Sequence, residues 1–204
     1  AHYVPRPKVR WHPVAAVVSY DGQLATSGIT TVLDSLRVWQ EDGAEEVDGM
    51  AGPLSAAIDT AREAGLLRCD HFLHLRCEVP MPTVVSEASA LIGRPDVRLA
   101  SLMDHTPGQR QFRDEGKLRD YYRGKKGGMT DAELDALFER RFEYQAKYFE
   151  KNYRELVGLA KTHSTPLASH DDTTLEHVDQ AVRDKVAIAE FPTTVEAAEA
   201  LHAN

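Results

Sequence analysis

The chain has 204 residues, of which 42% are hydrophobic, and it carries a formal net charge of −8. This length and composition suffice for the buried core of one domain and argue against a disordered chain. The acidic balance lacks the basic footprint that nucleic-acid binding requires, although a local group of Arg and Lys can still bind a small polyanion.

Cysteine usage and hydropathy indicate a reducing compartment. Cys69 and Cys77 are the two cysteines, and their spacing fits neither a zinc knuckle nor a dense disulfide framework. No stretch approaches the roughly 20 apolar residues that a spanning helix needs, and the Pro/Arg-rich start lacks an apolar signal core. We therefore expect a cytoplasmic protein without a membrane or nucleic-acid partner.

The first half of the chain alternates helical and strand patterns. Apolar residues from Val14 to Leu24 are spaced for a helix that ends at Gly28, the residue type preferred just past a helix C-terminus. The strands are β-branched or apolar runs, and Pro80 ends the second because proline cannot donate to a sheet ladder. The patterns predict helices over 11–27 and 54–66, strands over 28–36 and 71–79, and a polar loop over 40–52.

The second half continues the alternation. Thr130 and Glu133 form a capping box at the start of a long helical pattern through Leu159, which we expect to bend or break near Asn152. The remaining patterns predict strands over 97–105, 165–170 and 186–191, and helices over 84–92, 173–182 and 194–202.

Apolar strands that alternate with helices predict a parallel sheet buried on both faces by crossover helices. Polar groups at the strand carboxyl ends, without any glycine-rich phosphate fingerprint, favour a barrel over an open doubly wound sheet. A complete barrel takes about 250 residues, so we expect an α/β fold that is a partial TIM-type (β/α) barrel with about five parallel strands. Residues 1–204 would be the central part of a single barrel catalytic domain, with the N- and C-terminal portions missing.

Six separated motifs carry a family resemblance. They are PRPKVRW at 5–11, GITTVLDSL at 28–36, HLRCE at 74–78, SLMDHTPGQRQF at 101–112, LASHDDTT at 167–174 and AEFPTTVEAAEA at 189–200. Together they resemble the PhnM family, whose members are amidohydrolase-superfamily enzymes that hydrolyse α-D-ribose 1-methylphosphonate 5-triphosphate to the 5-phosphate and pyrophosphate in the carbon–phosphorus lyase pathway. Family members extend beyond both ends of this chain, and Tyr20, Gly22 and Lys185 depart from the family's pattern.

The resemblance implies a divalent metal, zinc or manganese. A bound divalent ion activates water and neutralises phosphoryl charge, and imidazole and carboxylate groups are suitable ligands. The expected ligands are Glu78, His105 and His170, each at the end of a different strand, with Glu78 able to bridge two ions. Glu190 stands where the superfamily usually has a histidine and is a further candidate.

Structural roles compete with these assignments. From spacing alone, a lone histidine at a strand end is more often a hydrogen-bonded structural residue than a ligand. That role is the preferred interpretation for His71 and His74. We expect Arg76 to face the barrel interior and to pair with a carboxylate such as Glu78 or Glu190.

Two groups complete the candidate site. Asp171 is the candidate general base toward a metal-bound water, whereas Asp172 is expected to cap the following helix. The segment after His105 is the candidate phosphate cradle, in which Gln109, Arg110 and Lys125 would bind substrate phosphate. A solvated, flexible loop is the alternative interpretation of this segment.

Two other functions remain open from the sequence. One is a different amidohydrolase, such as a deaminase or a cyclic-amide hydrolase, although the Arg/Gln/Lys-rich segment favours phosphate over a neutral ring. The other is a truncated, non-catalytic barrel fragment. Its open strand edges at 28–36 and 186–191 would favour a homo-oligomer or association with the missing fragments.

Overall fold

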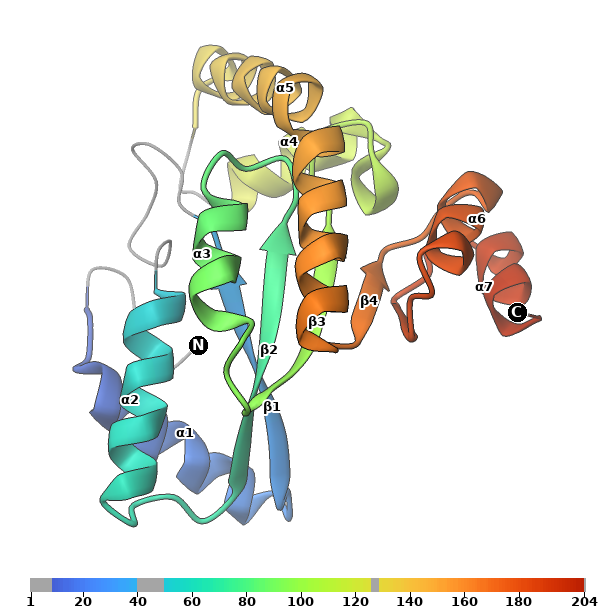
Figure 1. The fold of residues 1–204 in the computed structure, drawn as a ribbon. Coiled ribbons are helices and arrows are strands. Elements are labelled where there is room, and N and C mark those ends of the chain that lie inside the picture. Colours follow the sequence, from blue (N-terminus) through green and yellow to red (C-terminus); the bar gives the residue numbers. More distant parts are fainter. Residues whose placement is uncertain (1–8, 40–49, 126–128, 204) are drawn as a thin grey trace.

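The computed structural model describes residues 9–39, 50–125 and 129–203, without the side chain of Lys125 (Figure 1). The strands are β1 (Thr31–Val38), β2 (Asp70–Glu78), β3 (Val97–Met103), β4 (Leu167–His170) and β5 (Ile188–Glu190). The helices are α1 (Pro13–Thr26), α2 (Ala51–Glu63), α3 (Val84–Leu91), η1 (Arg110–Phe112), α4 (Glu115–Lys125), α5 (Asp131–His163), α6 (Leu175–Arg183) and α7 (Val195–His202). Every helix and strand that the sequence predicts is present, in the predicted order.

The five strands form one parallel sheet in which they follow the chain order β1-β2-β3-β4-β5. Parallel crossovers are right-handed in nearly all proteins, so a sheet whose order never reverses carries its crossover helices on one face. Figure 1 shows α2, α3 and the C-terminal part of α5 on the same side of the strands. The expectation that helices cover both faces of the sheet is therefore wrong for the described residues.

The covered face of the sheet is apolar. Leu36, Leu75, Ala100 and Leu167 are register neighbours across four strands, and each is at most 7% exposed. Burying a leucine side chain completely contributes about 1.5–3 kcal/mol. This row and the helices packed against it make up the core that holds the strands in place.

The opposite face, called the open face below, is largely polar. Arg37, Arg76 and Ser101 are register neighbours on it. Leu33 and Ile188 lie on the same face and are 41% and 48% exposed. Side chains that project from the open face near the strand ends are thus not covered by a crossover helix.

The region between β3 and β4 differs from the sequence prediction. Residues 110–112 form η1 and residues 115–125 form α4, in a segment for which the sequence predicted no helix or strand. The helix α5 begins at the predicted capping box and continues through Asn152 without a break, although Figure 1 shows its axis changing direction along its length. In the described part of the chain, no helix has the length and hydropathy of a membrane span.

Candidate metal centre

The predicted metal ligands lie at one edge of the sheet. Parallel strands share one edge for their carboxyl ends, and Glu78 and His170 are the last residues of β2 and β4. His105 follows β3 by two residues, and Asp171 follows β4 directly. One ligand atom from each of His105, His170 and Asp171 lies within 4.8 Å of the others. These three residues are called the strand-end cluster below.

The strand-end cluster has the geometry of groups that can share a cation. The Nδ1 atom of His170 lies 2.9 Å from Oδ2 of Asp171, and Nε2 of His105 lies 3.9 Å from the same oxygen. Within the described residues, neither His170 Nδ1 nor Asp171 Oδ2 makes a hydrogen bond, although both atoms are buried. Buried polar atoms are nearly always hydrogen-bonded, so two converging exceptions fit a site for a bound ion.

Glu78 orients His105 within the cluster. Its two carboxylate oxygens accept from the backbone N–H of His105 at 2.7 Å and from Nδ1 of the same residue at 2.5 Å. An Nδ1–H donated to a carboxylate fixes the ring and leaves Nε2 for a ligand. Both oxygens of Glu78 are thus engaged by His105, so the geometry favours an orienting role for Glu78 over a bridge between two ions.

Burial and charge act in opposite directions on this pair. Burial alone would raise the pKa of Glu78, but the charge of His105 and its hydrogen bonds hold this pKa at about 2. Burial alone would lower the pKa of His105, and the Glu78 carboxylate raises it above its usual value. Since a cation competes with the proton for an imidazole nitrogen, binding at His105 would release a proton.

Arg76 contacts the cluster from the open face. Its NH2 donates to Nε2 of His170 at 3.1 Å, and Nε and NH2 donate to Sδ of Met103 at 3.2 and 3.1 Å. The expectation that Arg76 pairs with Glu78 or Glu190 is wrong for the described residues, because both carboxylates are taken by other groups. A cation at His170 Nδ1 would leave the ring proton on Nε2 and displace the Arg76 hydrogen bond.

Glu190 lies beside His74 and not in the strand-end cluster. Its Oε2 accepts from Oγ of Ser101 at 2.6 Å, and its Oε1 lies 3.8 Å from Nε2 of His74. His74 also hydrogen-bonds to Ser101 and to Ser35, the latter at 3.2 Å. Burial lowers the pKa of His74. These contacts agree with the structural role expected for His74, and the ligand role of Glu190 stays a prediction.

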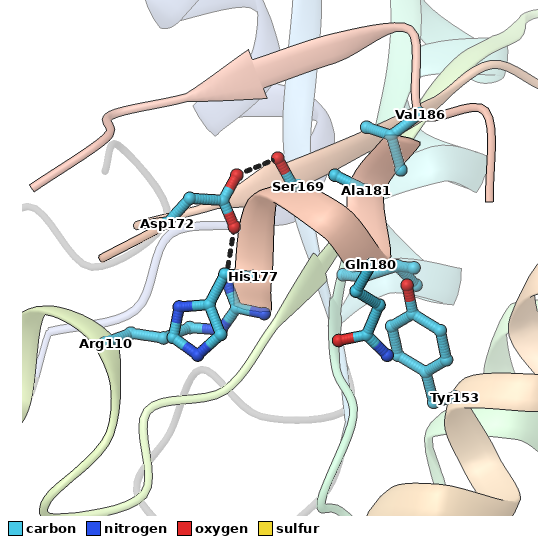
Figure 2. A pocket seen from close by; sticks show the side chains of 9 residues that line it. Arg110, Tyr153, Ser169, Asp172, His177, Gln180, Ala181 and Val186 are labelled. Atoms are coloured by element: carbon cyan, nitrogen blue, oxygen red, sulfur yellow. Dashed lines mark hydrogen bonds and ion pairs between the residues drawn. The ribbon is translucent and has the colours of Figure 1, made fainter. Parts of the chain in front are cut away.

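Arg110 is buried against the turn that follows β4, as Figure 2 shows. Its NH1 donates to the carbonyl of His170 at 2.6 Å and to Oδ1 of Asp172 at 2.8 Å. The other oxygen of Asp172 accepts from Ser169. The expectation that Asp172 caps α6 is wrong, because Thr174 is the N-cap and accepts from the backbone of the helix. Both residues of this ion pair line the pocket drawn in Figure 2, together with side chains of β3, β4, α5 and α6.

The phosphate-binding roles expected for Gln109 and Lys125 stay predictions. The backbone N–H of Gln109 donates to the carbonyl of Thr106 at 3.0 Å, which closes a turn next to Gly108 at φ 80°. The side chain of Lys125 lies outside the described residues. The guanidinium of Arg110 is engaged within the chain, so the geometry does not favour phosphate binding by this residue.

His71 belongs to a second polar group, at the opposite end of the sheet. Its Nδ1 lies 2.8 Å from Asp34, and its Nε2 lies 3.4 Å from Asp21. Asp21 is fully buried and also accepts from the backbone N–H groups of Arg68 and Cys69 at 2.8 and 2.9 Å. The group ties α1 to β1 and β2, which agrees with the structural role predicted for His71.

Sequence reasoning placed Arg76 near the site but missed its contact with His170, and it considered Asp171 as a base without considering it as a candidate metal ligand. A signal for Arg76 was present, because His74, Arg76 and Glu78 alternate along β2 and alternate residues of a strand point to the same face. No comparable signal marks Asp171, whose φ of 56° turns its carboxylate toward His170.

Comparisons with known proteins agree with the resemblance seen in the motifs. No family model matches the chain, and no solved structure matches it. The chain is 41% identical over 199 residues to the alpha-D-ribose 1-methylphosphonate 5-triphosphate diphosphatase of Escherichia coli (strain K12), an alignment that covers 97% of this chain and 52% of that protein. The chain thus spans about half the length of this relative, and over that half its similarity to the PhnM diphosphatase is confirmed.

Proposed function

We propose that the chain forms the metal-holding part of a metal-dependent hydrolase that releases pyrophosphate from α-D-ribose 1-methylphosphonate 5-triphosphate in phosphonate catabolism. The observation that carries this proposal is the convergence of His105, His170 and Asp171, with two buried atoms that make no hydrogen bond in the described residues. The 41% identity to a diphosphatase supports the reaction and the substrate.

The proposed fold is a partial (β/α) barrel of the amidohydrolase type, with residues 1–204 in one catalytic domain. A strand order without reversal and crossover helices on one face support it, because a barrel requires both features. The open face would then be the barrel interior. The strand-end cluster would lie at the carboxyl ends of the strands, where barrel enzymes keep their active sites.

The proposed cofactor is a divalent cation, zinc or manganese, for which imidazole and carboxylate are suitable ligands. His105 would bind it through Nε2, because Nδ1 is held by Glu78. His170 and Asp171 would supply the neighbouring ligand atoms. When bound, the cation lowers the pKa of a coordinated water and neutralises charge on the phosphoryl oxygens.

The chain's own residues would then orient the reaction. Asp171, with one oxygen toward the cation, would accept the proton of the attacking water on its other carboxylate oxygen. Glu78 would keep the His105 ring in the tautomer that leaves Nε2 free of a proton. Gln109 and Lys125 would bind the phosphates of the substrate, and Glu190 would bind a second cation if one is present.

Metal-dependent release of pyrophosphate tests this function. The chain, joined to the portions of its relative that it does not span, is incubated with α-D-ribose 1-methylphosphonate 5-triphosphate after removal of metal and again after addition of manganese or zinc. Pyrophosphate is measured by a coupled assay. We expect release only with metal, and a loss of release in His170→Ala. Equal rates with and without metal, or no release at saturating metal, would contradict the proposal. Release of ammonia from a cyclic amide or an aminated base would indicate a different amidohydrolase.

A further inference from the structure

Arg76 stands out among the charged side chains near the strand-end cluster. It projects onto the open face from β2, two residues before the end of the strand, and is partly buried. Within residues 9–39, 50–125 and 129–203, no carboxylate lies within ion-pair distance of its guanidinium. In these residues the guanidinium donates hydrogen bonds to the imidazole of His170 and to the thioether of Met103.

These partners are weak for a guanidinium. A thioether sulfur is a poor acceptor, and a neutral imidazole offers a single lone pair and no charge. A partly buried cation normally has an ionised partner, because desolvation of the charge is costly. The positive charge of Arg76 is therefore poorly compensated in the described residues, at a position next to candidate metal ligands.

Arg110 shows the contrasting arrangement. Its NH1 makes a charge-assisted hydrogen bond to Asp172 and a second bond to the carbonyl of His170, and both side chains of the ion pair are buried. The partners of the two arginines are thus the reverse of those that the sequence predicted. The arginine expected to bind phosphate has a carboxylate partner, whereas the arginine expected to pair with a carboxylate has none.

We propose that Arg76 is the residue that binds an anionic phosphoryl oxygen of the substrate beside the cation held by the strand-end cluster. This inference rests on the proposed function and adds the group that recognises the phosphate. A planar guanidinium can donate two parallel hydrogen bonds to a phosphate, and its contact to His170 Nε2 is the one that a cation at Nδ1 would displace. Release from His170 would leave the NH2 group of Arg76 available for an oxygen of the bound anion.

Binding of inorganic pyrophosphate, a product of the proposed reaction, tests this role. Calorimetric titration is carried out on the metal-free and on the manganese-loaded chain, for the wild type, Arg76→Ala and Arg76→Lys. The matched control is Arg98→Ala, which removes the same charge from an exposed arginine stacked over the Phe72 ring, 4.8 Å from its centroid. Circular dichroism and thermal unfolding check that each variant is folded.

We expect Arg76→Ala to weaken pyrophosphate binding about 10- to 100-fold, the effect of losing hydrogen bonds to a charged group. Arg76→Lys should lose less, because it keeps the charge without the fork, and Arg98→Ala should bind as the wild type does. Manganese affinity should not fall in Arg76→Ala. In a turnover assay the loss should appear in KM more than in kcat.

Several results would overturn the inference. Equal pyrophosphate affinity in Arg76→Ala and Arg98→Ala would show that Arg76 does not bind the anion, and a wild-type chain that does not bind pyrophosphate would show the same. If Arg76→Ala lost affinity for manganese but not for pyrophosphate, the role of Arg76 would be to position the metal ligands. If the wild type binds pyrophosphate through Arg76 but binds no metal, the result contradicts the proposed function and supports the anion site at Arg76.

Discussion

Removal of the Arg110 side chain should destabilise the fold strongly. Arg110 and Asp172 are 8% and 1% exposed as side chains and lie 2.8 Å apart, so their ion pair is out of contact with most solvent. Removing one partner of a buried ion pair costs about 3–5 kcal/mol, because the other charge stays buried alone. Arg110→Ala should therefore lower the free energy of unfolding by about this amount, whereas an exposed arginine contributes within about 0.5 kcal/mol.

Urea denaturation followed by circular dichroism measures this effect. The matched control is Arg113→Ala, an exposed arginine in the same segment. Asp172→Ala and the double variant complete a double-mutant cycle, and each single substitution removes the same ion pair. The sum of the two single losses should exceed the loss in the double variant by about 0.5–3 kcal/mol.

The reasoning is refuted if Arg110→Ala unfolds within about 1 kcal/mol of Arg113→Ala, or if the two single losses simply add. Either result would mean that the guanidinium is not held against Asp172 in solution. The sequence prediction that Arg110 binds substrate phosphate would then be the preferred interpretation.

Three further predictions concern other contacts. Glu78→Gln should lower manganese affinity about 10- to 100-fold in a calorimetric titration, because Glu78 orients His105. A loss of affinity beyond about 1,000-fold would instead indicate that Glu78 is itself a metal ligand. Asp21→Asn should lose about 2 kcal/mol of unfolding free energy at neutral pH. Although burial alone would raise the pKa of Asp21, its hydrogen bonds lower it from 3.8 to about 2. Its stabilisation is thus complete above its unfolded pKa and is lost as the pH falls toward 2, and the variant should lack this slope between pH 4 and 2 in acid unfolding. Asn152→Ala should lower the free energy of unfolding by about 2–3 kcal/mol in urea denaturation, because the Asn152 amide donates at 2.9 Å to two backbone carbonyls after β2. A change in this free energy below about 0.5 kcal/mol would contradict that reasoning.

The regular elements were predictable because their apolar spacing is local. Alternation of helix and strand patterns gave every strand of the sheet, with end positions shifted by a few residues at most. The helix α4 was not predictable in this way, because its sequence is strongly charged. Its position depends on Leu118, which packs against Leu137 and Phe138 of α5, and such a long-range contact leaves no local pattern.

The candidate site was predictable in its location but not in its contacts. Strands that run parallel bring their carboxyl ends to one edge, so Glu78, His105 and His170 could be expected to meet. The partners of Arg76 and Arg110 could not be foreseen. Arg110 adopts a φ of 47°, a left-handed conformation that non-glycine residues rarely adopt, and the sequence contains no signal for it.

Titration of the metal-free chain with manganese or zinc, followed by calorimetry, tests the strand-end cluster most directly. We predict that the wild type and the control His202→Ala, an exposed histidine of α7, bind with the same affinity. The variants His105→Ala, His170→Ala and Asp171→Ala should each lose more than about 100-fold in affinity, because a lost ligand costs more than a lost supporting contact. A wild-type chain that binds neither ion, or three variants that bind as tightly as the control, would contradict the account.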